Sequence, residues 1–144
     1  MIRAATPQDI DTLTHLAALL WPKEQPRVLA DEFAAMLTDN DAQLFLAFDN
    51  TNAIGFAQCQ LRHDYVEGTE TTPVGYLEGI FVKEGHRHQG HARALLAACE
   101  AWAKANGCKE FASDCELDNT DSFQFHKALH FNEAGRIICF TKRL

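Results

Sequence analysis

The chain has 144 residues, a length that predicts one domain over residues 1–144, because domains most often contain about 100–150 residues. Hydrophobic residues make up 47% of the chain and charged residues 23%, proportions that argue against a disordered or fibrous protein. Thirteen basic and twenty acidic side chains give a formal net charge of −7. Negative charge repels nucleic acid, so a cationic partner is the better expectation.

The cysteines and the N-terminus indicate the compartment. Five cysteines are an odd number and none forms a C-x-x-C pair, so we expect free thiols in a reducing cytosol. Residues 1–11 contain no charged and then apolar export segment, and every apolar run is far shorter than the roughly 20 residues that cross a bilayer. The sequence therefore predicts a cytoplasmic protein without membrane contact.

The first half of the chain predicts a strand, two helices and a β-hairpin. Thr6 is a suitable N-cap with Pro7 at the first helical position, and apolar residues then recur with helical spacing up to Trp21. Polar residues 49–52 form the expected hairpin turn. The expected elements are a strand at Ile2–Ala4, helices at 7–21 and Arg27–Leu37, and strands at Gln43–Phe48 and Ala53–His63.

The second half predicts strands that alternate with helices. Gly107 is placed as the residue that ends a helix beginning at Gly90. The other expected elements are strands at Tyr76–Lys83 and Lys109–Cys115, a helix at Asp121–Leu129, and two final strands at Phe131–Ala134 and Arg136–Lys142. A strand, helix and strand over residues 76–115 require parallel neighbours, so we expect an α+β fold with a mixed sheet.

The stretch Arg87-His88-Gln89-Gly90-His91-Ala92 lies between a predicted strand and the first turn of a predicted helix. Gly90 permits backbone geometry in which successive N–H groups converge on an anion, and Arg87 adds positive charge. The G-x-x-x-x-G-K-[ST] and G-x-G-x-x-G patterns of common ATP, GTP and NAD sites are absent. The residues alone predict a ligand that bears phosphate.

This loop resembles the acyl-CoA pyrophosphate loop of the GNAT acetyltransferase superfamily. Further blocks resemble the aminoglycoside 6'-N-acetyltransferases of the antibiotic-resistance type, in order along nearly the whole chain: Leu19–Pro22, Arg62–Val66, Leu77–Val82, Ala112–Asp114 and Phe140–Arg143. The resemblance implies a mostly antiparallel central sheet with helices on both faces and a splayed pair of parallel strands. It also implies acetyl-CoA as cosubstrate, no metal, and direct transfer in a ternary complex.

The resemblance implies two catalytic groups on the strand before the loop. The acceptor amine must lose a proton before it attacks, and the Glu78 carboxylate is placed to accept that proton directly or through water. The amide of Ile80 is the implied donor to the thioester oxygen as negative charge develops there. Gly79 permits the bulge or close approach that this geometry needs.

The resemblance also implies the binding residues. Trp21 and Tyr65 match positions that flank the drug and offer apolar faces to sugars and attraction to ammonium groups. Glu78 and Asp114 are the implied acidic contacts with the substrate. The implied acetyl-CoA contacts are the main chain of Ile80, Phe81 and Val82, the loop and helix residues His88, Gln89, Gly90, His91, Ala92 and Arg93, and Asn119.

The chain departs from the family pattern near its end. His126 stands where many family members have a tyrosine that protonates the leaving thiolate, so either His126 or solvent supplies that proton. His130-Phe131 replaces a Gly-Phe pair. Gly135 aligns with an acidic drug contact, which we expect to be lost here.

Several residues also have structural interpretations. Trp21 at the end of an amphipathic helix is typical of a core residue, and the acidic run from Asp114 to Asp121 is typical of a solvated loop. His86, His88 and His91 do not have the spacing of a common zinc site. Cys115 follows Asp114, but alternation along a strand turns the two side chains apart, so we expect a buried thiol without a catalytic role.

We therefore predict an acetyl-CoA-dependent aminoglycoside 6'-N-acetyltransferase. One alternative is a GNAT enzyme that acetylates a polyamine, a small amine metabolite or a protein N-terminus, because a fold does not fix its substrate. Another is a CoA-binding regulator without activity. Similar enzymes commonly form homodimers, and the apolar segment Ile137–Phe140 is suited to extend or exchange a sheet edge.

Overall fold

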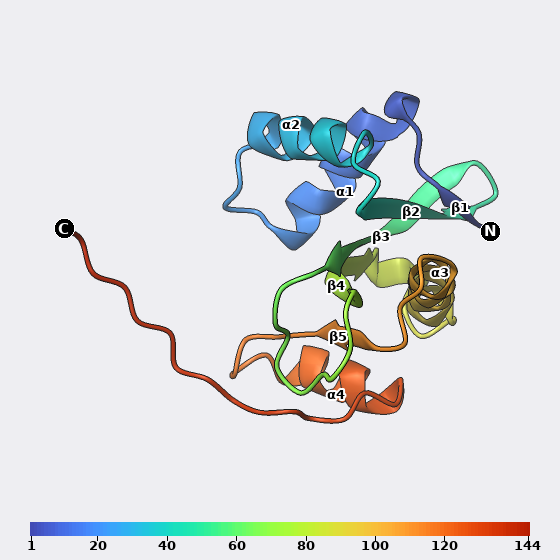
Figure 1. The fold of residues 1–144 in the computed structure, drawn as a ribbon. Helices are drawn as coiled ribbons and strands as arrows, with labels where there is room; N and C mark the ends of the chain where they lie inside the picture. The colour runs from blue at the N-terminus through green and yellow to red at the C-terminus, as the bar shows by residue number, and fades with distance from the viewer.

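The structure, a computed structural model, describes residues 1–144 and has one five-stranded sheet with two helices on each face (Figure 1). No helix has the length and apolar character needed to span a membrane. The strands are β1 (Ile2–Ala4), β2 (Ala42–Asp49), β3 (Asn52–Arg62), β4 (Val74–Val82) and β5 (Phe111–Ser113). The helices are α1 (Ile10–Leu20), α2 (Pro26–Met36), α3 (His91–Ala105) and α4 (Thr120–Ala128), and short 3-10 turns occupy Pro7–Asp9 and Glu84–His86.

The strands lie in the sheet in the order of the chain, from β1 to β5. The first four pair antiparallel, whereas β4 and β5 pair parallel, since α3 carries the chain back to the starting end of the sheet. This arrangement confirms the predicted α+β class with a mixed, mostly antiparallel sheet. The predicted hairpin also forms, and β2 and β3 are joined at the pair Asp49 and Asn52.

The helices α1 and α2 cover one face of the sheet because their apolar residues recur every three or four positions. Their inward side chains pack on alternate residues of β2 and β3, which point to a single face of the sheet. The buried cluster on this side consists of Leu13, Leu16, Ala17, Leu29, Phe33, Leu44, Leu46 and Phe56.

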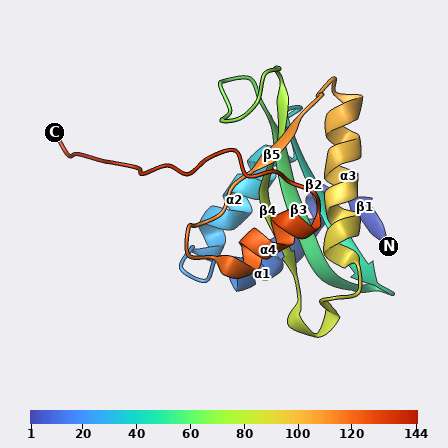
Figure 2. The same cartoon turned by 90° about the horizontal axis from the view of Figure 1, so that it is seen from below.

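The helix α3 covers the opposite face, where α4 lies beside it (Figure 2). The buried cluster on this side consists of Ala47, Ile54, Ala57, Cys59, Leu77, Val82, Leu95, Leu96 and Cys99. A hydrogen bond with Cys59, together with burial, raises the pKa of the Cys99 thiol well above its usual range. Cys99 therefore stays neutral, and both of these buried cysteines behave as small apolar residues in the core. Cys115, for which burial was expected, is instead exposed because it lies beyond the end of β5.

Two helices end in the same hydrogen-bonded motif but with different residues. After α3, Gly107 has φ of 88°, its N–H donates to Lys104, and Cys108 donates to Ala103. After α4, the corresponding left-handed residue is His130, with φ of 69° and the same hydrogen-bond pattern. Both ends are Schellman motifs, for which glycine is the preferred residue. The predicted end at Gly107 is confirmed, and the replacement of a Gly-Phe pair by His130-Phe131 leaves a side chain in a disfavoured conformation.

The two strands predicted at Phe131–Ala134 and Arg136–Lys142 are wrong. No regular structure follows α4, and the tail of the chain leaves the body of the protein (Figure 1). Its apolar side chains are almost fully exposed, with Ile137 at 78%, Ile138 at 81% and Phe140 at 87%. A strand is stable only against a partner edge, and this segment has none within its own chain.

We expect His130→Gly to stabilise the fold by about 1 kcal/mol, because glycine adopts the left-handed conformation without a Cβ penalty. Urea unfolding at equilibrium measures the change. The matched control is Gly107→Ala, which places a Cβ in the same conformation after α3 and should destabilise the protein by a similar amount. An unchanged or lower stability of His130→Gly would contradict the strain assigned to this position.

Candidate active site

The strand β4 is interrupted at Glu78. Leu77 pairs with Cys59 and Gly79 pairs with Gln58, so two consecutive residues of β3 face three residues of β4 and Glu78 has no partner. This is a β-bulge, which turns side chains and main-chain groups away from their regular directions. The irregularity expected around Gly79 is confirmed.

The pairing between β4 and β5 stops at the same level. The parallel register runs from Gly75 with Phe111 to Leu77 with Ser113 and goes no further. Beyond it, β4 continues through Ile80, Phe81 and Val82 with a partner only on the β3 side. The main chain of these three residues is therefore open toward the side of β5, which is the arrangement expected for an extended ligand that adds itself as a strand.

The loop that follows β4 is shaped by two residues in left-handed conformation. His88 has φ of 60° and Gly90 has φ of 85°, and Gly90 is the N-cap of α3. The first hydrogen bond of the helix joins the Ala94 N–H to the Gly90 carbonyl. The N–H groups of His91, Ala92 and Arg93 therefore have no acceptor within the helix and carry its positive dipole end. This geometry suits an anion.

Arg87 connects the loop to the end of β4. Its Nε donates to the carbonyl of Val82 at 2.8 Å, and its guanidinium lies 5.7 Å from the centre of the Phe81 ring. The arginine thus ties the loop back to the end of β4 while it adds positive charge there.

The Glu78 carboxylate has one oxygen that is fully engaged. Oε1 accepts hydrogen bonds from Gln60 Nε2 at 2.7 Å, from Arg62 Nη2 at 2.8 Å and from Arg62 Nε at 3.3 Å. Oε2 accepts no hydrogen bond from the protein. The side chain is 21% exposed, so it is held at the edge of the protein interior with one oxygen available to a ligand.

Asp114 is held by a phenol. The Tyr76 hydroxyl donates a short hydrogen bond to Asp114 Oδ2. Burial, and secondly the bond to Asp114, raises the pKa of Tyr76 well above its ordinary value, so the phenol stays a donor. Tyr76 and Glu78 are two residues apart on β4, and Arg62 spans them, because its guanidinium pairs with Glu78 and stacks 3.4 Å from the centre of the Tyr76 ring.

Trp21 lies against the bulge. A Cβ placed on Gly79 would come within 2.8 Å of the Trp21 ring, so the indole occupies the space that a side chain would need. The ring also meets Phe56 edge to face at 6.0 Å and borders the core under α1 and α2. Trp21 is therefore both a border residue of the core and a spatial neighbour of Gly79 in the bulge.

Two predicted site residues lie apart from these contacts. Tyr65 is 78% exposed in the loop between β3 and β4, and its one side-chain hydrogen bond goes to Glu67. Asn119 is the N-cap of α4, where its Oδ1 accepts from the Ser122 N–H. Its Nδ2 group remains available, so capping does not exclude contact with a ligand.

His126 meets the last paired residue of β5. Its Nε2 lies 2.8 Å from Ser113 Oγ, and its Nδ1 lies 2.7 Å from the Ser122 carbonyl. Because a carbonyl only accepts, Nδ1 carries a hydrogen. Phe125 and Phe131 stand at its ring edges. The imidazole is thus fixed where β4 and β5 begin to separate.

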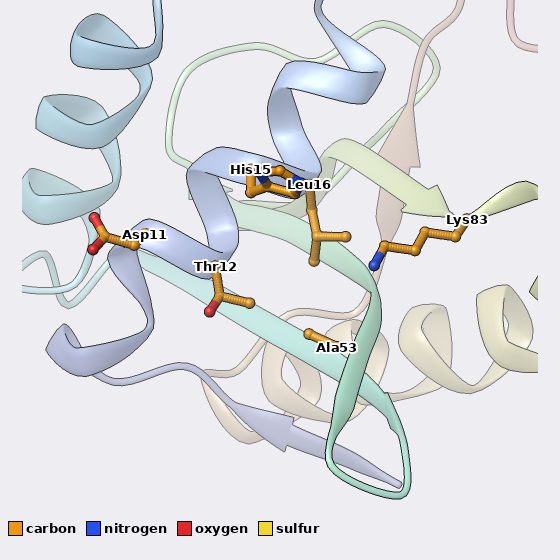
Figure 3. Close-up of a pocket in the computed structure, with 6 residues that line it drawn as sticks. All are labelled: Asp11, Thr12, His15, Leu16, Ala53 and Lys83. Carbon is orange, nitrogen blue, oxygen red and sulfur yellow. The ribbon is translucent and has the colours of Figure 1, made fainter.

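One shallow pocket lies elsewhere. It has a volume of about 280 Å³ and forms between α1 and the ends of β3 and β4 (Figure 3), where its lining residues are Asp11, Thr12, His15, Leu16, Ala53 and Lys83. None of the predicted site residues lines it. No group of three or more His, Cys, Asp and Glu side chains is arranged to hold a metal ion.

Comparison with known proteins identifies the family. The model of the acetyltransferase (GNAT) family matches residues 10–131. The chain belongs to the GNAT family. It is 40% identical over 144 residues to the aminoglycoside N(6')-acetyltransferase type 1 of Stenotrophomonas maltophilia, covering 99% of this chain and 93% of that protein. It is 41% identical over 143 residues to the Salmonella typhimurium enzyme of the same name, covering 99% and 98%.

Solved structures of aminoglycoside acetyltransferases have the same fold as this chain. AAC(6')-Iy in complex with the bisubstrate analog CoA-S-monomethyl-acetylneamine superposes with a TM-score of 0.96 at 37% identity, covering 100% of this chain and 98% of that one. The aminoglycoside 6'-N-acetyltransferase AAC(6')-Ig from Acinetobacter haemolyticus gives 0.95 at 36% identity, covering 100% and 99%. AAC(6')-Iy has also been solved in complex with CoA, with a TM-score of 0.97 at 37% identity.

Three site residues were missed by the sequence analysis: Gln60, Arg62 and Tyr76. Each is two positions from another polar or charged residue of the same strand, and residues two apart share a face of a sheet. That spacing was a usable signal. The spacing does not show which charged residues pair, because the pairing of Glu78 with Arg62 depends on the bulge in β4.

We expect Gly79→Ala to displace Trp21 and to destabilise the protein by about 1–3 kcal/mol, the usual cost of overpacking. In a Trp102→Phe background Trp21 is the only remaining tryptophan, so its fluorescence reports the displacement directly. The control is Gly85→Ala, where a new Cβ meets nothing within 4 Å. Equal spectra and equal stability for both alanine variants would disprove the close contact.

Proposed function

We propose that this chain transfers the acetyl group of acetyl-CoA to the 6'-amino group of aminoglycosides and so confers resistance to these antibiotics. The observation that carries the proposal is the position of Glu78, a carboxylate at a β-bulge where the main chain of β4 becomes open on the side of β5. The full-length similarity to aminoglycoside N(6')-acetyltransferases supports the substrate class.

The open stretch of β4 and the loop before α3 are suited to bind acetyl-CoA. The cosubstrate supplies an activated acetyl thioester. The main chain of Ile80, Phe81 and Val82 pairs with its amide-bearing arm. The N–H groups from His88 to Arg93 bind its pyrophosphate, because they lie at the positive end of α3 and have no partners within the helix.

The acceptor amine needs a base, since an ammonium ion has no free electron pair. Glu78 is suited to this role because Arg62 and Gln60 hold Oε1 while Oε2 remains available. Oε2 accepts the proton directly or through a water as the amine attacks the carbonyl carbon. The Ile80 amide stabilises the negative charge that develops on the thioester oxygen.

The substrate carries several positive charges, and the site offers anionic and aromatic groups. Asp114 and Glu78 attract ammonium groups, while Trp21 and Tyr65 present flat apolar faces to sugar rings. Tyr65 lies on an exposed loop and is not packed against the other site residues. Its ring therefore contacts the site only when the drug is bound between them. With Gly135 in place of an acidic residue, the tail contributes no charge at that position.

The purified protein should release CoA thiol when it is mixed with acetyl-CoA and tobramycin or kanamycin. Competition with polyamines, small amines and peptide N-termini tests the substrate class, because the proposal predicts a clear preference for polycations that contain sugar rings. If the protein acetylates a polyamine in preference to every drug, the proposed substrate class is wrong and polyamines are the substrates. Binding of acetyl-CoA without transfer to any amine would favour a regulator instead.

Glu78→Gln should lower kcat by about 10²-fold, the usual contribution of a general base. Binding of acetyl-CoA, followed by calorimetry, should change little, because the cosubstrate contacts the main chain of β4. The variant keeps the size of the side chain and one oxygen that can accept from Arg62 and Gln60, but it cannot take up the proton. A weakened acetyl-CoA affinity with unchanged kcat would contradict the assignment.

We also propose that the chain forms a homodimer through its tail. The segment Ile137–Phe140 is extended and exposed, and β5 is an edge strand of the sheet. An exposed apolar segment of this kind is stabilised by pairing with a sheet edge. A second copy of the chain offers that edge.

Sedimentation should give the mass of two chains for the intact protein and one chain for the double variant Ile138→Asp, Phe140→Asp. The control is Leu117→Asp, which changes a residue that is 79% exposed in the loop after β5 and should leave the mass unchanged. A monomeric intact protein, or a double variant that stays dimeric, would refute the tail as the dimer contact.

A further inference from the structure

We propose that Arg62 is a positioning residue for acetyl transfer, which acts by fixing Glu78 so that a single oxygen of its carboxylate faces the acceptor amine. This inference rests on the proposed function, because it assigns Arg62 a task in that reaction. Arg62 lies at the end of β3, and the network around it joins the two acidic residues of the site.

The hydrogen bonds at Glu78 are one-sided. Arg62 donates to Oε1 through Nε and Nη2, Gln60 donates to it through Nε2, and nothing in the protein donates to Oε2. A free carboxylate rotates and presents either oxygen. Three donors on one oxygen fix the rotation of this carboxylate and leave the other oxygen to accept a proton.

The Arg62 guanidinium is itself held in place by the Tyr76 ring. Its guanidinium lies 3.4 Å from the centre of the Tyr76 ring, and the Tyr76 hydroxyl donates to Asp114. Stacking on an aromatic face restricts a long side chain that is 37% exposed. One connected set of contacts thus fixes Glu78 on β4 and Asp114, which directly follows β5.

Placing a cation here works against substrate binding. The proposed acceptor is positively charged, and Arg62 repels it while neutralising part of Glu78. Simple electrostatic attraction therefore does not explain an arginine at this position. Orientation of the general base does, since small displacements of a reacting group cost much of the rate.

This role predicts a specific kinetic signature. Removing the arginine should lower kcat, because the base is no longer oriented, without raising KM for the aminoglycoside, because a repulsive charge has been lost. A residue that only braces the fold would instead lower the melting temperature and affect binding of both substrates.

The chain provides a matched control in Arg3. Arg3 pairs with Asp9 at 2.7 Å and lies 4.7 Å from the centre of the Phe48 ring, and its side chain is 38% exposed. It thus repeats the ion pair, the stacking and the exposure of Arg62 away from the site. Arg3→Gln should lower stability and leave kcat within twofold.

The experiment measures kcat and KM for tobramycin with Arg62→Gln, Arg62→Lys, Glu78→Gln and the double variant Arg62→Gln, Glu78→Gln. Melting temperature and acetyl-CoA binding verify that each variant folds. We expect about a tenfold lower kcat for Arg62→Gln with no rise in KM, and a smaller loss for Arg62→Lys, which keeps one donor. In the Glu78→Gln background, Arg62→Gln should change kcat less than twofold.

Three results would overturn the inference while the proposed function stands: an active wild type with unchanged kcat in Arg62→Gln, a rise in KM alone, or equal losses in both backgrounds. Loss of folding in Arg62→Gln leaves the test to Arg62→Lys, for which unchanged kcat would be equally decisive. A wild type that acetylates no amine would overturn the proposed function and this inference together.

Discussion

The structure depends on one interruption, the unpaired residue Glu78 in β4. From Gly75 to Leu77 the strand is an ordinary buried member of the sheet, paired with β3 on one side and with β5 on the other. Glu78 has no partner, Gly79 to Val82 pair only with β3, and residues 78–81 are partly exposed. A single extra residue thus changes a structural strand into a surface with open main-chain groups and an accessible carboxylate, at the point where β5 diverges.

Residues from helices on both faces of the sheet lie around the bulge. Trp21 at the end of α1 takes the space above Gly79, which is available because glycine has no side chain. His126 from α4 meets Ser113 where the parallel pairing stops. Helices on opposite faces of the sheet therefore contribute to one region. The two large cores keep these helices in place, so the site is built on rigid elements.

The charges of the site differ from those of the chain as a whole. The net charge of −7 suits a polycationic ligand, yet the central carboxylate, Glu78, forms an ion pair with an arginine. The two acids are held in different ways, Glu78 by cationic and amide donors and Asp114 by a neutral phenol. Only the charge of Glu78 is partly neutralised by a cation of the protein. Glu78 is therefore less suited than Asp114 to attract a cationic substrate and better explained by a role in the reaction.

The sequence by itself determined the order of the elements through β5 and α4, the glycine that ends α3, and the loop geometry around Gly90, because periodicity and special backbone conformations are local properties. It did not determine the tail, whose β-like pattern of Ile137, Ile138 and Phe140 needs a partner edge that this chain lacks. The pairing of Arg62 with Glu78 and of Tyr76 with Asp114 was decided by tertiary structure alone. These pairs depend on strand register and on the bulge, which place residues from separate strands side by side.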